Sequence, residues 1–219
     1  EKGLHLTVAE TGWGKASWGK IYGQWLCGCG VMVYDFDIFS PEKLLKVIED
    51  FKVTSFCAPP TVYRYFIKKD MKKFDLSHLE HITTAGEALN PEVFEQVHKQ
   101  TGLQIMEGFG QTESVLMLGN LVGSTAKIGS LGKPTPLYNI MIADNEGNRL
   151  PANEVGEIVV IPSENQHGIF MGYCGNEDLY ANVWKYGIYH TGDTAYMDDD
   201  GYYWYVGRID DLIKTRGYR

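Results

Sequence analysis

The sequence predicts an α/β fold in which a parallel sheet flanked by helices is followed by an antiparallel, β-barrel-like part. Two observations indicate this order: short apolar runs alternate with helical segments early in the chain, and paired strand segments joined by turn residues follow. We therefore divide the chain into an α/β subdomain over residues 1–134, an antiparallel β subdomain over 135–207, and a hinge segment over 208–219.

Two helices in the first part are predicted from their starting residues. Ser40 is followed by Pro41 and an acid, and Asn90 is followed by Pro91 and an acid. Ser and Asn side chains accept hydrogen bonds from the free amides of a first helical turn, and Pro is tolerated there because its position needs no N–H donor. Gly102 predicts the end of the second helix.

Short apolar runs predict the strands. In the first part they lie beside the predicted helices, as βαβ units around a parallel sheet require, and they are residues 53–57, 81–84 and 103–106. In the second part, residues 138–142 and 157–161 are strand-like, with turn residues at 145–148. A second hairpin is predicted around the turn at 198–201.

Composition narrows the classes of partner. Of the 219 residues, 44% are hydrophobic and 22% are charged, which is typical of a folded protein. The formal net charge of −8 and the lack of a Lys/Arg cluster longer than a pair argue against nucleic acid as a partner. No run reaches the roughly 18–20 apolar residues of a membrane span, and the first residues do not resemble a signal peptide.

The four cysteines predict buried free thiols. Cys27 and Cys29 are two positions apart, but no second Cys/His pair lies at zinc-binding spacing from them, and Cys57 and Cys174 stand alone. Free thiols persist in reducing compartments, so we expect a cytoplasmic protein.

Two motifs in the first part carry groups that suit a nucleotide. Residues 84–88 (T-A-G-E-A) end a predicted strand, where a glycine lets a flat ligand approach the backbone. Residues 107–113 (E-G-F-G-Q-T-E) hold an aromatic ring that can stack on a base, a hydroxyl for phosphate oxygens, and a carboxylate for Mg²⁺. Taken alone, an ordinary strand-to-helix turn and a Gly-rich loop explain them equally well.

Two further motifs lie in the second part. Residues 189–193 (Y-H-T-G-D) place a carboxylate on a tight turn, where it can accept both hydroxyls of a ribose, although T-G-D is also a common turn. Residues 207–219 (G-R-I-D-D-L-I-K-T-R-G-Y-R) mix cations, acids and glycines directly after a hairpin.

In order and spacing, these motifs resemble the signatures of the adenylate-forming superfamily, which comprises acyl-CoA synthetases, peptide-synthetase adenylation domains and luciferases. The resemblance runs through essentially the whole chain. The segments T-V-A-E-T-G-W near the start and A-P-P-T-V-Y-R in the middle are most similar to the acetyl- and medium-chain acyl-CoA synthetase branch. The resemblance thus implies a truncated fragment of an acyl-CoA synthetase N-terminal domain.

The resemblance also implies a role for individual residues. The residues that would line the adenine are Gly86, Glu87, Ala88, Glu107, Gly108 and Phe109, the last packing on its face. Thr112 would contact the phosphates, and Glu113 would hold Mg²⁺. Asp193 would bind the ribose hydroxyls with the help of Arg208.

The last segment would serve the moving parts of such an enzyme. The resemblance places Asp210 at the hinge about which a C-terminal lid rotates. Gly217 would let the pantetheine of coenzyme A pass close to the backbone, and Arg219 would reach the phosphates. Thr112, Glu113 and Arg219 are therefore the candidate catalytic residues.

The implied reaction has two steps and uses ATP, Mg²⁺, a carboxylic acid and coenzyme A. The acid attacks the α-phosphorus to give an acyl-adenylate and pyrophosphate, and the thiol of coenzyme A then displaces AMP. The family's Lys-bearing phosphate loop and its small C-terminal domain do not occur in this sequence. We therefore expect the 219-residue chain alone to be inactive or nearly so.

Gly110 bears on the acid. Acetate-specific members of the family carry a bulky Trp at the matching position, so a glycine would open room for methylene groups, each worth roughly 0.8 kcal/mol when buried. We therefore expect a medium-chain or branched short-chain acid. Trp13 and Trp25 are candidate walls of the acyl pocket or else core residues, and Lys15 lies near a carboxylate or coenzyme A or else on the surface.

Two other functions stay open at this point. The chain could belong to an adenylation domain that activates an amino or aryl acid for a carrier protein, or it could be a non-catalytic nucleotide-binding domain. Its sequence is also compatible with a homo-oligomer.

Overall fold

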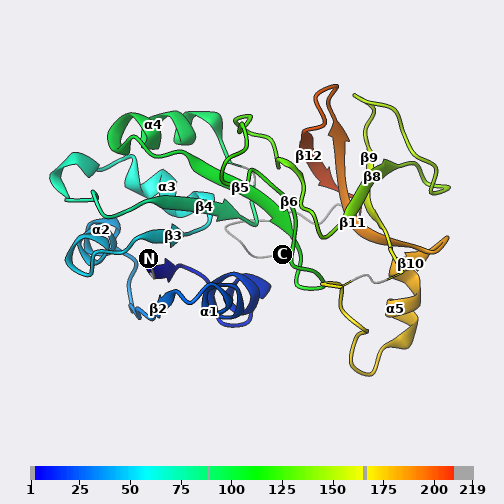
Figure 1. Ribbon diagram of the computed structural model, residues 1–219, viewed down its shortest axis with the longest axis horizontal. Coiled ribbons are helices and arrows are strands. Elements are labelled where there is room, and N and C mark those ends of the chain that lie inside the picture. The colour runs from blue at the N-terminus through cyan, green and yellow to red at the C-terminus, as the bar shows by residue number, and fades with distance from the viewer. Residues whose placement is uncertain (1–2, 88, 165–166, 210–219) are drawn as a thin grey trace. The chain divides into compact units, whose positions relative to one another are not determined.

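The computed structural model describes residues 3–87, 89–164 and 167–209 (Figure 1). Four of the predicted site residues lie outside them: Ala88, Asp210, Gly217 and Arg219. The chain divides into two compact units, Glu1–Glu107 and Gly108–Arg219. The subdomain boundaries expected at 134 and 207 stay predictions.

The first unit is built on a parallel sheet, as predicted. Its strands follow the order β2 (Gly30–Met32), β1 (Leu4–Thr7), β3 (Ser55–Cys57), β4 (His81–Ala85) and β5 (Ile105–Gly110). The first four run parallel to their neighbours. Strand β5 continues from the first unit into the second.

Two helices of this unit begin where the sequence predicts: α2 (Pro41–Asp50) and α4 (Pro91–Thr101). Between them lie α3 (Pro60–Phe66) and the short η2 (Met71–Lys73), which were not predicted. Ser40 Oγ accepts from the amide of Lys43 at 3.3 Å, and Asn90 Oδ1 accepts from the amide of Glu92 at 2.8 Å. Gly102 ends α4 with a φ of +76°. Both predicted helices are confirmed.

The two faces of the sheet differ in chemistry. One face buries an apolar core against α2, α3 and α4, with residues such as Leu45, Phe56, Phe66, Ile82, Val97 and Ile105. Side chains alternate between the two faces of a strand, so His5 of β1 lies on the face opposite to Leu6, which belongs to this core. The His5 ring nitrogens lie 2.7 Å from Ser55 Oγ and 2.5 Å from Thr7 Oγ1. Burial lowers the pKa of His5 to about 4, so its ring is neutral at pH 7.

A segment without strong helix signals precedes β2. Residues Lys15–Tyr22 form η1, which has π-helical hydrogen bonding, and Gly23–Leu26 form the short α1. A π-helical stretch is rare and is found mostly near functional sites. Its first residue is Lys15, so that side chain projects from an unusual turn of backbone.

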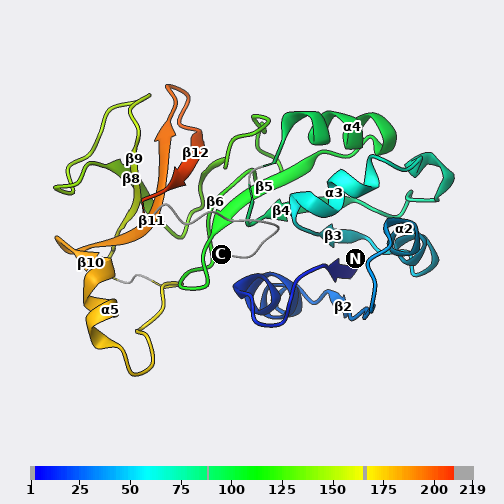
Figure 2. The same cartoon turned by 180° about the vertical axis from the view of Figure 1, so that it is seen from behind.

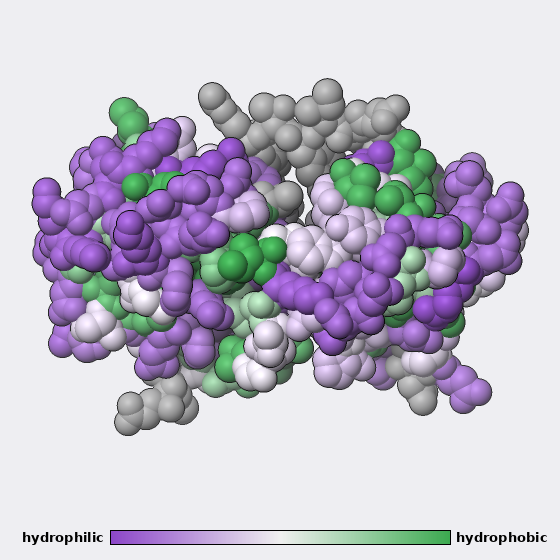
Figure 3. All heavy atoms as spheres, turned by 90° about the horizontal axis from the view of Figure 1, so that it is seen from above, coloured by the Kyte–Doolittle hydropathy of each residue, from purple (hydrophilic) through white to green (hydrophobic). Residues whose placement is uncertain are grey.

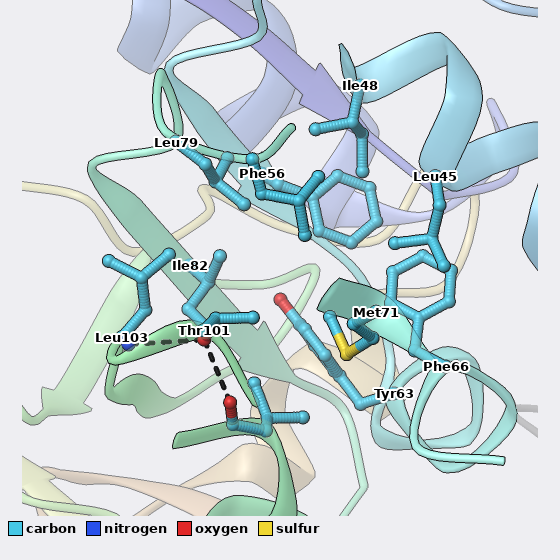
Figure 4. A pocket seen from close by; sticks show the side chains of 12 residues that line it. Leu45, Ile48, Phe56, Tyr63, Phe66, Met71, Leu79, Ile82, Thr101 and Leu103 are labelled. Atoms are coloured by element: carbon cyan, nitrogen blue, oxygen red, sulfur yellow. Dashed lines mark hydrogen bonds between the residues drawn. The ribbon is translucent and has the colours of Figure 1, made fainter. Parts of the chain in front are cut away.

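The apolar core of the first unit contains a cavity of about 10 Å³. Figure 4 shows Phe56, Phe66, Met71 and Ile82 lining it. This volume is close to what one water molecule needs, and an apolar lining offers that water few partners. The cavity is therefore a packing feature of the core and not a binding site.

The second unit is antiparallel. The end of β5 pairs with β6 (Leu116–Gly119), and β6 pairs with β7 (Lys133–Pro134). A second sheet has the order β10 (Trp184–Lys185), β11 (Ile188–Met197), β9 (Gly156–Ile161) and β8 (Asn139–Ala143), while β12 (Tyr203–Arg208) also pairs with β11. Helix α5 (Glu177–Val183) leads into β10 (Figure 2). Both predicted hairpins are confirmed.

Most of the face in Figure 3 is hydrophilic, with small hydrophobic groups scattered over it. Apolar side chains gather instead in the interior of each unit; the largest set in the second unit includes Met117, Leu118, Ile158, Val160 and Tyr203. Over the described ranges, no helix combines the length and apolar character that crossing a bilayer demands.

The expectation of buried thiols is wrong. The four cysteines are free, as predicted, but Cys27 and Cys174 are exposed, and Cys29 and Cys57 are half-buried. Cys27 follows α1, whose residues are all at least partly exposed, so the apolar run around it does not form core. An apolar stretch predicts burial only when a neighbouring element covers it.

Gly132 lies where neighbouring backbone leaves no room for a side chain. Its φ is +85°, and a Cβ there would lie 2.1 Å from the carbonyl carbon of Gly119. Its carbonyl accepts from the amide of Tyr203 at 3.0 Å, which ties β12 to the chain just before β7. Only glycine fits both the backbone angle and the space.

Gly132→Ala should destabilise the protein far more than Gly123→Ala. Both glycines have a φ of +85°, but a Cβ at Gly123 meets nothing within 4 Å. Both variants therefore carry the left-handed strain of about 1–2 kcal/mol, and the clash should add about 1–3 kcal/mol for Gly132 alone. Urea unfolding of the two variants measures the difference, and equal losses would contradict the steric argument.

Candidate functional site

A buried carboxylate stands at the centre of the second unit's polar network. Asp193 is 1% exposed. Its Oδ2 accepts from Gln111 Nε2 at 2.7 Å and from Arg208 Nη1 at 3.3 Å. Its Oδ1 accepts from the hydroxyl of Tyr205 at 3.1 Å. An ionised carboxylate has room for about four hydrogen bonds, so these three donors, the ones found among residues 3–87, 89–164 and 167–209, leave one acceptor position.

Strand pairing brings these donors to Asp193. Arg208 lies directly opposite Asp193 in the β11–β12 ladder, and Tyr205 lies on the same strand. Gln111 follows β5 and reaches across to β11 with its side chain. Residues from two separate predicted motifs therefore meet at one carboxylate.

Gln111 is held from several directions. Its Nε2 also donates to the carbonyl of Thr191 at 2.8 Å, and its Oε1 accepts from the hydroxyl of Tyr189 at 2.8 Å. Burial, helped by the nearby Glu113 charge, raises the pKa of Tyr189 far above its usual value, so the hydroxyl stays protonated and donates. Gln111, Tyr189 and Tyr205 were not assigned roles from the sequence, although two of them lie inside the motifs.

The other residues of the 107–113 motif have different surroundings. Thr112 is exposed. Glu113 is half-buried, and its Oε1 accepts from the hydroxyl of Tyr173 at 3.0 Å. Phe109 is only 8% exposed because its ring belongs to the apolar core of the second unit. Its packing against an adenine stays a prediction.

Gly110 has a structural role that the pocket argument did not consider. The β5–β6 ladder is irregular between Phe109 and Gly110. A Cβ at Gly110 would lie 2.4 Å from the carbonyl oxygen of Val115 and 3.1 Å from its carbonyl carbon. A bulky residue at position 110 would therefore have to displace backbone. A Gly110→Trp variant would change the local structure as well as the size of an acyl pocket.

In the first unit, the 84–88 motif ends β4 and is contacted by Lys15. The Lys15 ammonium donates to the carbonyl of Ala85 at 2.6 Å, close to Gly86, whose φ is +96°. Burial lowers the pKa of Lys15, while Cys57 and Glu87 oppose that shift. Lys15 is thus attached to the motif, which the sequence left undecided.

Two glutamates flank this segment with incomplete hydrogen bonding. Glu87 Oε2 accepts from Thr61 Oγ1 at 3.0 Å and from Arg64 Nη2 at 3.2 Å. Glu107 is 4% exposed, and its Oε1 accepts from the amide of Leu89 at 3.1 Å. The second oxygen of each is buried and has no partner among the described residues. Such acceptors suit a ligand that brings N–H or O–H donors.

The two candidate pocket tryptophans differ in burial. Trp13 is half-buried, and its place in the acyl pocket stays a prediction. Trp25, for which a pocket wall and the core were both considered, is 63% exposed in α1. The core interpretation of Trp25 is wrong because the described residues of the first unit leave this side chain largely exposed.

Glu107 should make stability depend on pH. Burial raises its pKa from 4.5 to about 7, so between these values the folded protein holds a proton that the unfolded chain releases. The free energy of unfolding should therefore fall by about 3 kcal/mol from pH 4.5 to 7 and stay level above that.

Glu107→Gln should remove this dependence while keeping an oxygen for the Leu89 amide. Relative to the parent, the variant should become more stable as the pH rises from 4.5 to 8, as followed by urea unfolding at each pH. Glu95→Gln, an exposed change in α4, is the control and should leave the profile unaltered. A parental profile in Glu107→Gln would show that this carboxyl is not the titrating group.

Comparison with known proteins places the chain in a family. Residues 13–174 match the family model described as AMP-binding enzyme. The mouse (Mus musculus) mitochondrial acyl-coenzyme A synthetase ACSM3 is 41% identical over 214 residues, which is 97% of this chain and 37% of that protein. The human (Homo sapiens) mitochondrial acyl-coenzyme A synthetase ACSM4 is 41% identical over 213 residues, with the same shares of each chain.

Solved structures of CoA ligases are similar to this chain in fold. The crystal structure of the anthranilate CoA ligase AuaEII in complex with anthranoyl-AMP has a TM-score of 0.88 and 30% identity, covering 99% of this chain and 42% of that one. The Brucella canis acyl-CoA synthetase has a TM-score of 0.85 and 28% identity, with coverage of 99% and 40%. This chain therefore spans less than half the length of the proteins that it matches.

The expected cytoplasmic localisation is contradicted, because the mouse and human acyl-coenzyme A synthetases that match this chain are mitochondrial proteins. Free cysteines indicate a reducing compartment without saying which one. The fold class and the family resemblance, in contrast, are confirmed: the chain belongs to the AMP-binding enzyme family.

Proposed function

We propose that this chain is part of an AMP-forming acyl-CoA synthetase and that its second unit binds the ribose of the nucleotide. The observation that carries the proposal is the Asp193 carboxylate, which residues of separate motifs hold from several sides. The relatives named acyl-coenzyme A synthetase support the reaction class.

Asp193 suits a ribose because it combines charge with an acceptor position that the donors in the described part of the chain leave open. The longest of its three hydrogen bonds is the one to Arg208, at 3.3 Å. A ribose hydroxyl can donate to the remaining acceptor position, or it can replace Arg208 at Oδ2 and free the guanidinium to turn toward phosphate oxygens. Hydrogen bonds to a charged acceptor contribute about 1.5–3 kcal/mol each, enough to affect nucleotide affinity strongly.

The phosphate end of the nucleotide needs a hydroxyl and a metal. Thr112 is exposed, and its hydroxyl is the group that would bind a phosphate oxygen. Glu113 uses Oε1 for the Tyr173 hydroxyl. Mg²⁺ in nucleotide sites is held by one or two carboxylates together with phosphate oxygens and water, so the single carboxylate of Glu113 fits such an ion. When bound, the ion would offset phosphate charge.

The chemistry asks mainly for positioning. A carboxylate oxygen attacks the α-phosphorus of ATP and pyrophosphate leaves, and then the thiol of coenzyme A attacks the acyl carbonyl and AMP leaves. Residues that hold ribose and phosphates in line with the attacking acid supply most of what this reaction needs from a protein. No nucleophilic side chain is required.

We assign a medium-chain or branched short-chain acid as substrate, from the absence of a bulky residue at Gly110. A second substrate class has its own support, since one similar structure is an anthranilate CoA ligase. An aryl acid activated for coenzyme A is therefore the alternative. No observation favours a carrier protein as acceptor.

The reaction can be tested with the full-length protein that contains this chain. AMP and pyrophosphate release would be followed with carboxylates from acetate to octanoate, branched acids, benzoate and anthranilate, each with and without coenzyme A. We expect turnover of C4–C8 or branched acids, with AMP release that needs coenzyme A. Turnover of acetate alone would refute the substrate class, and AMP release independent of coenzyme A would refute the acceptor.

Asp193→Asn in the full-length protein should raise the KM for ATP by about ten- to a hundredfold, because a charged acceptor of the ribose becomes neutral. Initial rates against ATP concentration measure this change. Asp199→Asn, an exposed change in the adjacent hairpin turn, is the control and should leave the KM unchanged. An unaltered KM in Asp193→Asn would exclude the ribose role.

A further inference from the structure

The turn that carries Asp193 cannot be held by the sheet alone. Strand β11 pairs with β9 up to His190 and again from Thr194, and the register shifts between them. The residues in between therefore leave the ladder with β9, although Asp193 stays paired with Arg208 of β12. Their backbone groups on the β9 side need other partners. Gly192 takes a φ of +71° there.

Side chains replace the missing ladder bonds. The amide of Asp193 donates to Thr191 Oγ1 at 3.1 Å, and that hydroxyl donates to the carbonyl of Ile158 at 2.7 Å. The carbonyl of Gly192 accepts from the amide of Ile209 at 3.0 Å. The amide of Gly192 donates to Glu157 Oε1 at 2.7 Å.

Glu157 holds the turn at two places. Its Oε2 lies 2.7 Å from His190 Nδ1, and both side chains are 13% exposed. An ionised carboxylate only accepts, so Nδ1 carries the proton and donates. The carboxylate therefore binds the residue before Thr191 and the residue after it, and the imidazole in turn orients the carboxylate.

We propose that Glu157 is a positioning residue for ribose recognition: it fixes the T-G-D turn so that the Asp193 carboxylate points toward the ribose hydroxyls. The proposal rests on the proposed function, in which Asp193 binds the ribose. Glu157 lies on β9 and acts on Asp193 through the Gly192 amide, one residue away.

The structure explains why Glu157 would affect ribose recognition more than overall catalysis. The Gly192 amide immediately precedes the Asp193 backbone, so its release shifts the carboxylate, and a displacement of about 1 Å can weaken an aligned interaction up to a hundredfold. Thr112 and Glu113, proposed to serve the phosphates, lie on the loop after β5, whereas the hydrogen bonds of Glu157 go to Gly192 and His190. Loss of Glu157 should therefore raise the KM for ATP and leave kcat nearly unchanged.

The discriminating measurement is the preference for ATP over 2′-deoxy-ATP. This preference reports the hydrogen bond to the 2′-hydroxyl and does not change when a protein is merely less stable. It would be measured as the ratio of the two kcat/KM values in the full-length protein, together with the thermal midpoint of each variant.

Glu157→Ala should raise the KM for ATP by about tenfold and bring the nucleotide preference close to one. Glu157→Gln keeps one oxygen that can accept from the Gly192 amide, so it should restore part of the preference. The Gln variant also keeps the side-chain volume, which secures the test if the Ala variant does not fold. Glu154→Gln, an exposed change just before β9, is the matched control and should behave like the parent.

The outcomes distinguish failure of the Glu157 positioning role from failure of the ribose site at Asp193. If Asp193→Asn abolishes the preference but folded Glu157→Ala or Glu157→Gln retains the full parental preference, the positioning role is refuted and the ribose site stands. If Asp193→Asn also retains the full preference, the ribose site is refuted, and the role of Glu157 with it. A loss of the preference for ATP that increases from Glu157→Gln to Glu157→Ala to Asp193→Asn supports both the positioning role and the ribose site.

Discussion

The rest of the second unit's polar architecture depends on one constraint: the negative charge of Asp193 is removed from water. Transfer of a carboxylate into a protein interior costs several kcal/mol unless hydrogen bonds and a counter-charge offset it. Gln111, Tyr205 and Arg208 meet that need. Their placement requires the β11–β12 pairing and a fixed course for the loop after β5.

The first unit treats a buried carboxyl group differently. Glu107 has one donor where Asp193 has three, and one of its oxygens has no partner among the described residues. Desolvation therefore prevails and raises the pKa of Glu107 to about 7. A carboxyl group with a pKa near 7 can switch between donor and acceptor close to neutral pH.

Backbone approach imposes a second kind of constraint. Gly110 and Gly132 are required because neighbouring backbone occupies the space of a side chain. At Gly110 this backbone constraint exists beside the role that the proposed substrate class gives the residue. The register shift between Phe109 and Gly110 lies directly before Gln111, which bonds to Asp193.

Several features were determined by the sequence itself because they depend on neighbours in the chain. Ser40 and Asn90 cap helices through amides two or three residues away, and the turns at 145–148 and 198–201 join adjacent strands. The ordered motifs were sufficient to indicate the family. These local rules act over a few residues, so they can be recognised without a structure.

Only the tertiary structure decided which distant residues meet and which are covered. Glu157 contacts the T-G-D turn across 35 residues of chain, Tyr205 and Gln111 reach Asp193 from different strands, and Lys15 reaches Ala85 across 70. The exposure of Cys27 and Trp25 contradicted their apolar sequence context. Burial and long-range hydrogen bonding depend on packing between elements, and a local residue pattern does not specify that packing.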